Sequence, residues 1–215
     1  MKTYPKPSGA VAWKSFLATS MLLAASVFVP PVQAANDGPW QIRVRGIGII
    51  PDENATVTVL GGDVDVSNEV VPELDITYFF TDHFAAELIL ATARHDATAT
   101  TGPTDLGSVR ILPPTLTLQY HPFPDAQIRP YIGAGVNYTF FYDVDAPAGL
   151  SIDYDNKPGV ALQVGFDIPV GNGWLVNVDV KRLWLETDVT INGGAIRADL
   201  DIDPWIIGGG IGYRF

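Results

Sequence analysis

The chain has 215 residues, with 24 acidic and 13 basic side chains and no cysteine. Without cysteine it has no disulfide framework and no thiol or cysteine-type metal chemistry. The formal net charge of −11 makes nucleic acid an implausible partner, because phosphate binding needs clustered positive charge. Yet 47% of the residues are hydrophobic and 11% are aromatic, so the fold must bury them.

The N-terminal segment has the order of a secretory signal peptide. Residues 1–15 contain Lys2, Lys6 and Lys14 and no acidic residue. They are followed by an apolar run over 16–29 and by the small-residue site PPVQA, which ends at Ala34. The apolar run is shorter than the roughly 20 residues that a retained membrane anchor needs. We therefore expect cleavage after residue 34 and an exported mature chain of residues 35–215.

The mature chain alternates apolar and polar residues with period two, which is the signal of β-strands. The segments VALQVGFDI (160–168) and WLVNVDV (174–180) show it clearly, and no stretch has a convincing helical stripe. The pattern predicts eight strands, at roughly 40–50, 70–80, 84–94, 111–120, 130–142, 159–168, 174–190 and 195–215.

Short and long connections alternate between these strands. The short ones are 81–83, 121–127 and 170–173, the long ones are 51–69, 95–110 and 143–158, and NGG (192–194) is a tight hairpin signal. An even number of antiparallel strands with short turns on one side and long loops on the other is typical of an outer-membrane barrel. The predicted fold is an all-β, eight-stranded antiparallel transmembrane barrel with short periplasmic turns and long extracellular loops.

The last strand separates a membrane barrel from a soluble barrel. Its apolar and aromatic residues share one face, and its other face is mainly glycine. From Trp205 to Phe215, at about 3.3 Å per residue and a tilt near 40°, the strand spans roughly 25 Å, the height of an outer-membrane apolar band. The aromatics expected at the two membrane interfaces are Trp40, Trp174, Trp205, Tyr213 and Phe215.

Three segments resemble the OmpW family of small outer-membrane proteins: ITYFFTDHFAAEL (76–88), PPTLTLQYHPFPDAQIRPYIGAGVNYTFF (113–141) and DPWIIGGGIGYRF (203–215). The resemblance implies an eight-stranded barrel in the outer membrane of a Gram-negative bacterium. It also implies a narrow, largely hydrophobic lumen linked to passage of small hydrophobic molecules, and an alkane-uptake branch belongs to the same family. The closing Phe215 is similar to the signal read by the barrel-assembly machinery.

Charged residues are predicted on the inward face of several strands: Arg43, Arg45, Glu73, Asp75, Glu87, Asp179 and Lys181. Burying an unpaired charge is prohibitively costly, so we expect them to pair with one another. They form either an ion-paired plug that merely fills the lumen or a floor that stops ions while a guest binds above it. An eight-stranded barrel has little interior room, which argues against an open aqueous pore.

Several prolines fall near the predicted extracellular ends of strands, among them Pro72, Pro113 and Pro114. Each lacks an N–H and removes a possible rung from its hydrogen-bond ladder. One interpretation is that they lie just above the bilayer and simply end strands. The other is that they weaken the wall and open a sideways exit into the membrane.

No catalytic, cofactor or metal site is predicted. His83 and His121 fall in periplasmic turns and His95 at the opposite rim, so they cannot converge on one metal ion. The sole catalytic combination at the rim is His95 with Ser67 or Ser108 and a loop aspartate, and we interpret these as solvated loop residues. The glycines of GGGIG (208–212) relieve crowding inside a small barrel rather than bind a nucleotide.

Two functions remain open. The first is a narrow conduit for passive uptake of a small hydrophobic ligand, with lateral release. The second is a non-transporting structural or receptor barrel whose acidic loops, 51–69 and 143–157, meet a phage, a toxin or a host surface. The expected partners are outer-membrane lipids and lipopolysaccharide, which the loop carboxylates would contact through divalent cations, and the barrel-assembly machinery.

Overall fold

The structure, a computed structural model, describes residues 38–52, 54–57, 64–99, 104–194 and 196–215. These residues all belong to one unit, Pro31–Phe215. The predicted signal peptide, residues 1–34, lies outside the described residues, as do the loop acids Glu53 and Asp63.

Nearly all regular structure in the described residues is β-strand. A single 3₁₀ turn, Asn192–Gly194, connects two strands at the predicted NGG hairpin, with φ of 67° at Gly193 and 97° at Gly194. The strands are β1 Trp40–Ile50, β2 Asn54–Val57, β3 Val64–Val66, β4 Glu69–Phe79, β5 Phe84–Ala91, β6 Ala93–Ala99, β7 Thr104–Leu112, β8 Thr115–Tyr120, β9 Arg129–Asp145, β10 Ile152–Tyr154, β11 Lys157–Gly171, β12 Trp174–Trp184, β13 Glu186–Ile191, β14 Ile196–Asp201 and β15 Trp205–Arg214.

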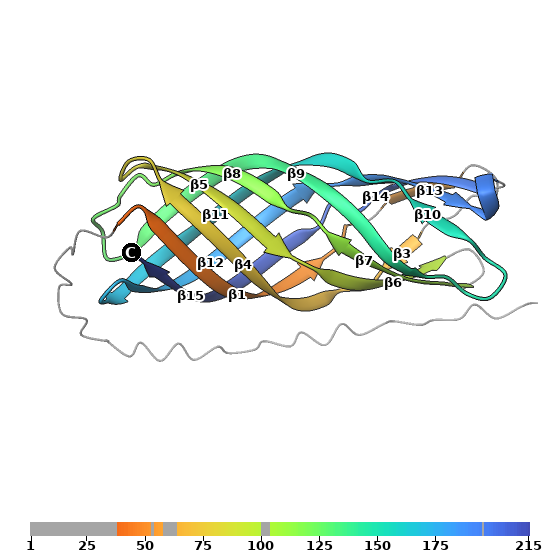
Figure 1. The fold of residues 1–215 in the computed structure, drawn as a ribbon, viewed down its shortest axis with the longest axis horizontal. Coiled ribbons are helices and arrows are strands. Elements are labelled where there is room, and N and C mark those ends of the chain that lie inside the picture. The colour runs from red at the N-terminus through yellow and green to blue at the C-terminus, as the bar shows by residue number, and fades with distance from the viewer. Residues whose placement is uncertain (1–37, 53, 58–63, 100–103, 195) are drawn as a thin grey trace, which may run out of the picture. The chain divides into compact units, whose positions relative to one another are not determined.

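Eight of these strands close into a ring (Figure 1). Their order is β1–β4–β5–β8–β9–β11–β12–β15, and β15 pairs back onto β1. Every pairing in the ring is antiparallel. Closure leaves no free sheet edge in the ring, which is the condition for a β-structure to lie in lipid. The predicted eight-stranded antiparallel barrel is confirmed.

The remaining strands continue the wall at the end away from the C-terminus (Figure 1). β7, β6 and β3 continue the sheet of the ring from β9, in the order β9–β7–β6–β3, whereas β10–β13–β14–β2 forms a separate four-stranded sheet. The prediction of long loops at 51–69, 95–110 and 143–158 was therefore wrong in part, because each range contains strand residues. Segments such as IDY (152–154) are short and polar on one or both faces, so hydrophobic periodicity does not reveal them. None of the described residues forms a helix long and apolar enough to cross a membrane.

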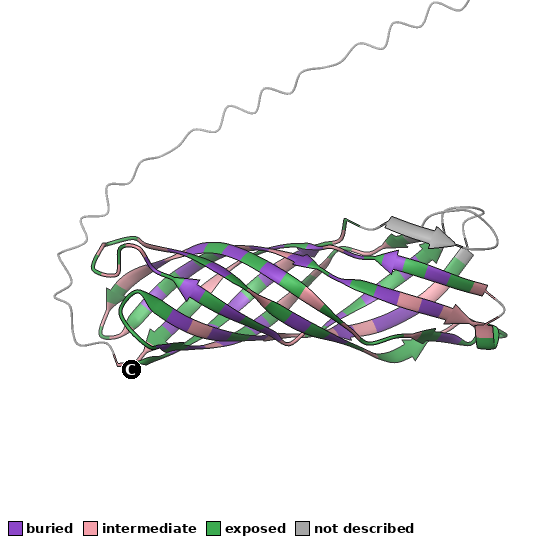
Figure 2. Cartoon of the chain, turned by 90° about the horizontal axis from the view of Figure 1, so that it is seen from above, coloured by how far each residue is buried: buried purple, intermediate pink, exposed green. Residues whose placement is uncertain are grey.

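Burial alternates along the ring strands (Figure 2). On β1, Arg43 is fully buried, Val44 is 54% exposed and Arg45 is 1% exposed. The exposed face carries large apolar residues on every side of the ring, including Val136, Leu162 and Ile211. This inside-out polarity is that of a membrane barrel, not of a soluble one.

Aromatic residues gather at both ends of the apolar wall. Near the C-terminus, Trp40 packs on Tyr78 with ring centroids 4.8 Å apart, and Trp174 packs on Tyr213 at 5.1 Å. At the other end the Arg182 guanidinium lies 5.1 Å from the centroid of Trp205. Aromatic girdles at the two interfaces are a feature of outer-membrane barrels.

The final residue is part of the closed wall. The N–H of Phe215 donates to the carbonyl of Trp40 at 2.8 Å, and the N–H of Trp40 donates to the carbonyl of Phe215 at 3.2 Å. The glycines of β15 give the barrel interior room, since a Cβ at Gly212 would lie 2.9 Å from Cγ of Arg43.

Candidate functional site: a lumen divided into a charged floor and an apolar cavity

The half of the lumen nearer the C-terminus is filled by a cluster that we call the charged floor. Its members come from β1, β4, β5, β11 and β12, and none is more than 3% exposed. They are Arg43, Arg45, Glu73, Asp75, Glu87, Asp167, Asp179 and Lys181.

Arg43 is the centre of the floor. Its guanidinium contacts Asp75 at 3.1 Å, Glu87 at 2.9 Å and Asp167 at 2.8 Å. These three carboxylates belong to β4, β5 and β11, so one side chain from β1 holds strands on both sides of the lumen. Arg43 also lies 5.3 Å from the ring centroid of the buried Tyr131.

Arg45 and Lys181 extend the network toward the extracellular side. Arg45 contacts Glu73 and Asp75, each at 2.8 Å. Lys181 contacts Glu73 at 2.9 Å and Asp179 at 2.7 Å. Such a network costs desolvation energy, but each of its charged side chains contacts at least one side chain of opposite sign.

All seven predicted lumen charges lie in the floor, but the prediction left several members of the network out. Asp167 was not among them, although it pairs with Arg43. Neutral partners were also missing: Gln119 and Gln163 donate to Glu87 at 2.8 and 2.7 Å, and Asn177 donates to Asp167 at 2.8 Å. The same period-two alternation identifies these residues in the sequence, because each lies on the polar face of its strand.

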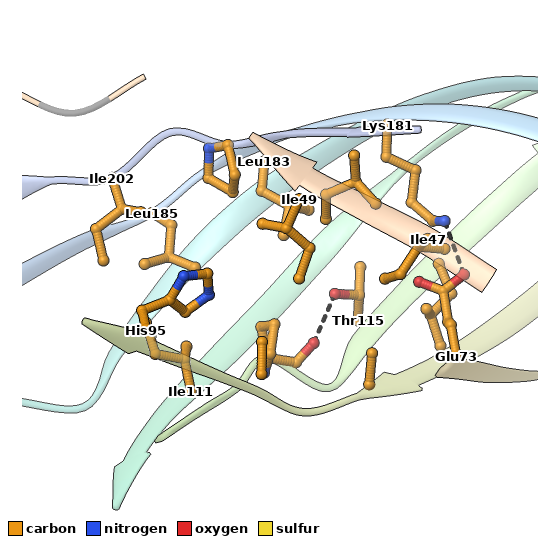
Figure 3. A pocket seen from close by; sticks show the side chains of 16 residues that line it. Ile47, Ile49, Glu73, His95, Ile111, Thr115, Lys181, Leu183, Leu185 and Ile202 are labelled. Atoms are coloured by element: carbon orange, nitrogen blue, oxygen red, sulfur yellow. Dashed lines mark hydrogen bonds and ion pairs between the residues drawn. The ribbon is translucent and has the colours of Figure 1, made fainter. Parts of the chain in front are cut away.

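Above the floor lies a small apolar cavity (Figure 3). Its volume is about 50 Å³, and Glu73 and Lys181 bound it on the floor side. Nearly all other lining side chains are aliphatic, as Figure 3 shows around its centre. The lining residues are Ile47, Ile49, Glu73, Ile89, Ala91, Ala93, His95, Ile111, Pro113, Thr115, Lys181, Leu183, Leu185, Ile202, Pro204 and Ile206.

His95 lines the cavity but is not part of a catalytic arrangement. Its Nδ1 lies 2.8 Å from the backbone carbonyl of Ser67, not from the hydroxyl. The Ser67 hydroxyl donates to Glu69 at 2.8 Å, and the Ser108 hydroxyl accepts from Arg94 at 2.9 Å. A serine nucleophile needs its base within hydrogen-bond reach, and neither contact provides that.

The wall beside the cavity has an interrupted ladder. β5 pairs with β8 up to Ile89↔Thr115, and β6 pairs with β7 from Ala93↔Ile111. Both strands advance by the same number of residues between these pairs, so the register places Ala91 opposite Pro113. No pairing joins these two residues in the described part of the wall.

Pro113 accounts for the missing rung. The carbonyl of Pro114 accepts from Tyr138 N–H on the β9 side at 3.2 Å. Successive residues of an antiparallel strand bond to opposite neighbours, so Pro113 is turned toward Ala91. Pro113 has no N–H to donate, and its carbonyl accepts instead from the Thr115 hydroxyl at 2.9 Å.

The other side of the same strand is interrupted one residue further on. The β4–β5 ladder ends at Glu73↔Ala91, so the register places Thr92 opposite Pro72, which also lacks an N–H. Thr92 is the junction between β5 and β6. We call Ala91 and Thr92, with the facing Pro72 and Pro113, the seam. On the outer surface the hydroxyls of Thr92 and Tyr142 lie 2.6 Å apart. This hydrogen bond joins the β5–β6 junction to β9, on the side of the strand that faces Pro113.

Several carboxylates at the extracellular end are paired with nearby basic side chains. Asp143 accepts from Arg110 at 2.8 Å, and Asp145 contacts Arg94 at 3.3 Å. Within the described ranges, no group of three or more histidine or carboxylate side chains is placed to hold a metal ion.

A closed eight-stranded antiparallel barrel, apolar outside between aromatic belts and with a charged cluster buried inside, is a transmembrane barrel of the outer-membrane type. Similarity to known proteins agrees with this class. The family model described as the OmpW family matches residues 36–215. The chain therefore belongs to the OmpW family, and it resides in the outer membrane of a Gram-negative bacterium.

Individual relatives extend the comparison. The uncharacterized outer-membrane protein y4mB of Sinorhizobium fredii is 45% identical over 205 residues, which cover 89% of each chain. The dibenzothiophene metabolism operon protein PahQ of Pseudomonas aeruginosa is 31% identical over 191 residues, covering 84% of this chain and 90% of that protein. The crystal structure of the outer membrane protein OprG from Pseudomonas aeruginosa matches with a TM-score of 0.78 at 29% identity, covering 86% of this chain and 99% of that chain.

Proposed function

We propose that this barrel is a narrow conduit for passive uptake of small hydrophobic molecules, which it releases sideways into the outer membrane. One observation carries the proposal: an apolar cavity lies between a closed charged floor and an interrupted stretch of wall. The cavity residues Ala91 and Pro113 belong to the seam itself, so the cavity and the weak point of the wall adjoin.

The floor closes the axial route. A guest that continued toward the periplasm would have to separate Arg43, Arg45 and Lys181 from their carboxylates, and an unpaired buried charge is very costly. An apolar guest gains nothing by entering the aqueous periplasm, whereas the hydrocarbon outside the seam solvates it well. The lowest barrier therefore leads through the wall.

The size of the cavity restricts the guest. Pockets for drug-sized ligands are typically about 300–1,000 Å³, and this cavity of about 50 Å³ is far smaller. Slender or flat molecules fit this restriction, with the surrounding aliphatic side chains moving apart during passage. The relative PahQ is named a dibenzothiophene metabolism operon protein, and this supports a hydrophobic cargo.

The second candidate function is a receptor or structural barrel. The strands β7–β6–β3 and β10–β13–β14–β2 extend the protein beyond the eight-stranded ring, which a conduit alone does not require. In this role the rim would contact lipopolysaccharide, a phage, a toxin or a host surface.

For either function we propose that Phe215 is read by the barrel-assembly machinery and that residues 1–34 are removed on export.

Filling the cavity tests the conduit. Ala93, which is 5% exposed and lines the cavity, is replaced by phenylalanine; Ala134→Phe on the exposed outer face of β9 is the matched control. Uptake of radiolabelled n-octane by cells with equal amounts of folded barrel should fall severalfold for Ala93→Phe and stay unchanged for Ala134→Phe. Equal uptake by the two variants and the wild type would favour the receptor function.

A further inference from the structure

One polar side chain in the apolar cavity has an unused hydrogen-bonding atom. His95 is 4% exposed, lines the cavity above the floor and is labelled in Figure 3 between Leu185 and Ile111. It is the sole histidine among the lining residues of this cavity. Burying a polar ring among isoleucine and leucine side chains is unfavourable unless its nitrogens are hydrogen-bonded.

The contact of Nδ1 fixes the tautomer. Nδ1 lies 2.8 Å from the carbonyl oxygen of Ser67, and a carbonyl accepts hydrogen bonds but never donates them. Nδ1 therefore carries the proton. A neutral imidazole has one N–H, so Nε2 presents a lone pair, which is a hydrogen-bond acceptor.

Within the described residues, Nε2 of His95 has no hydrogen-bond partner and no carboxylate pairs with the ring. The other polar groups of the cavity are already engaged. Thr115 donates to the carbonyl of Pro113, and Glu73 and Lys181 pair with each other. An unoccupied acceptor thus faces a cavity whose other polar groups are already paired and whose remaining lining is aliphatic.

We infer that the cavity recognises molecules with a short apolar body and one hydrogen-bond donor, such as alkanols or phenols, and that Nε2 of His95 accepts the donor. This inference rests on the proposed function, because it assigns the guest class of the same cavity. When a guest hydroxyl donates to Nε2, both Nε2 and the hydroxyl gain a hydrogen bond inside the cavity, whereas an alkane leaves Nε2 without a partner. His95 is therefore a specificity-determining residue for hydroxylated over unsubstituted hydrocarbon guests.

The test compares two isomeric probes, 1-octanol and heptyl methyl ether, which share a formula and differ in that only the alcohol donates. Both are titrated into the mature protein in lipid nanodiscs with ¹⁵N-labelled histidine and ¹³C-labelled isoleucine methyls. Both probes should shift the methyls of Ile47, Ile111 and Ile202, which line the cavity. Only 1-octanol should move the ¹⁵N resonance of Nε2, because only it donates a hydrogen bond there.

The variant His95→Asn sharpens the test. The amide nitrogen of asparagine can reach the Ser67 carbonyl as Nδ1 does, but the side chain lacks the Nε2 acceptor. The affinity ratio of 1-octanol to ether should fall about two- to tenfold, the range of one net hydrogen bond. The matched control is His83→Asn, where Nδ1 also contacts a carbonyl, that of His121, at 2.8 Å, far from the cavity. This variant should keep the wild-type ratio.

The outcomes separate the two ideas. If both probes shift the isoleucine methyls but Nε2 responds to them equally, or the ratio survives in His95→Asn, the donor-specific inference is overturned and the conduit stands. If neither probe shifts the methyls, the cavity binds no such guest, and the proposed function falls together with the inference.

Discussion

The two halves of the lumen obey the same strand alternation and yet hold opposite chemistry. Around the floor, inward positions carry Arg43, Asp75 and Glu87, and the ring ladders are continuous. Around the cavity, inward positions carry aliphatic residues such as Ile111 and Leu185, and the ladder is interrupted on both sides of one strand. In the floor half, side chains occupy the lumen and the wall has no missing rung. In the cavity half, the lumen contains an empty volume and the wall has missing rungs.

This difference shows where a small barrel can tolerate an opening in its wall. In hydrocarbon every backbone group needs a partner inside the protein, so a missing rung is tolerated only with a substitute. Thr115 supplies one by donating to the freed carbonyl of Pro113. The salt-bridge network holds strands β1, β4, β5, β11 and β12 together below, which allows the wall above to loosen without loss of the barrel.

The largest expected effect comes from breaking the floor. Arg43→Met leaves Asp75, Glu87 and Asp167 without their shared cation, and removal of one partner from a buried ion network costs about 3–5 kcal/mol. Urea unfolding in detergent micelles, followed by gel mobility before and after boiling, should show this loss. Arg94→Met is the matched control, because its pair with Asp145 is 49% and 76% exposed and contributes at most about 1 kcal/mol. An equal loss in both variants would contradict the special role of the floor.

The contrast between the halves also explains what the sequence reveals. The floor and ring are predictable because Arg43, Glu73 and Asp179 are charged residues in strict alternation with apolar ones, a pattern with few structural solutions. The cavity is much less visible, because Ile47 or Leu183 on an inward face and Ile42 or Val44 on an outward face are the same chemistry. Strand alternation extends the inward face from Arg45 to Ile47, but only closure of the ring, which brings β1 beside β15, shows that such residues meet around a cavity.

The seam shows a different limit. The sequence points to Pro72, Pro113 and Pro114 as equivalent ladder breakers, but their effect depends on which neighbour each backbone group faces. The structure turns Pro113 toward Ala91 and Pro114 toward Tyr138, and this follows from strand register that no single segment encodes. Beyond the ring, β3 and β10 escape prediction for a different reason, since each has three residues and is too short to show an alternating pattern.

The next largest effect concerns the closed end of the barrel. Deleting Phe215 removes an aromatic side chain and its two backbone hydrogen bonds to Trp40. Refolding in detergent should lose no more than about 1.5–3 kcal/mol, the value for full burial of such a side chain, because Phe215 is 53% exposed on the barrel, whereas the amount of folded barrel in the outer membrane should fall much further. Phe123→Ala, in a turn and 63% exposed, is the control that should change neither quantity. Normal membrane levels without Phe215 would reject its role as an assembly signal.

A smaller change in stability is expected at the seam. Pro113→Ala with Pro72→Ala restores two N–H groups facing the β5–β6 junction, but the unfolded chain also gains freedom, so the unfolding free energy should change by no more than about 1 kcal/mol. Uptake of n-octane should nevertheless fall severalfold, because the restored rungs close the sideways exit. Pro114→Ala, which faces β9, is the comparison expected to have the weaker effect on uptake. If all the variants fold well and uptake is unchanged, the lateral route is wrong and the charged floor must open instead.

The smallest expected effect, and the one with the opposite sign, is on the outer surface of the seam. The hydrogen bond of 2.6 Å between Thr92 and Tyr142 joins the β5–β6 junction to β9, which pairs with β7 and β8, so it ties the two sides of the missing rung together indirectly. Tyr142→Phe removes this bond and keeps the ring, and because the bond is exposed the unfolding free energy should fall by about 0.5 kcal/mol, the low end for one hydrogen bond. Uptake should rise rather than fall, because a looser seam opens more often. Tyr138→Phe, which removes an exposed hydroxyl from the same strand, should leave uptake unchanged. A decrease in uptake with Tyr142→Phe would show that the hydrogen bond shapes the exit instead of holding it shut.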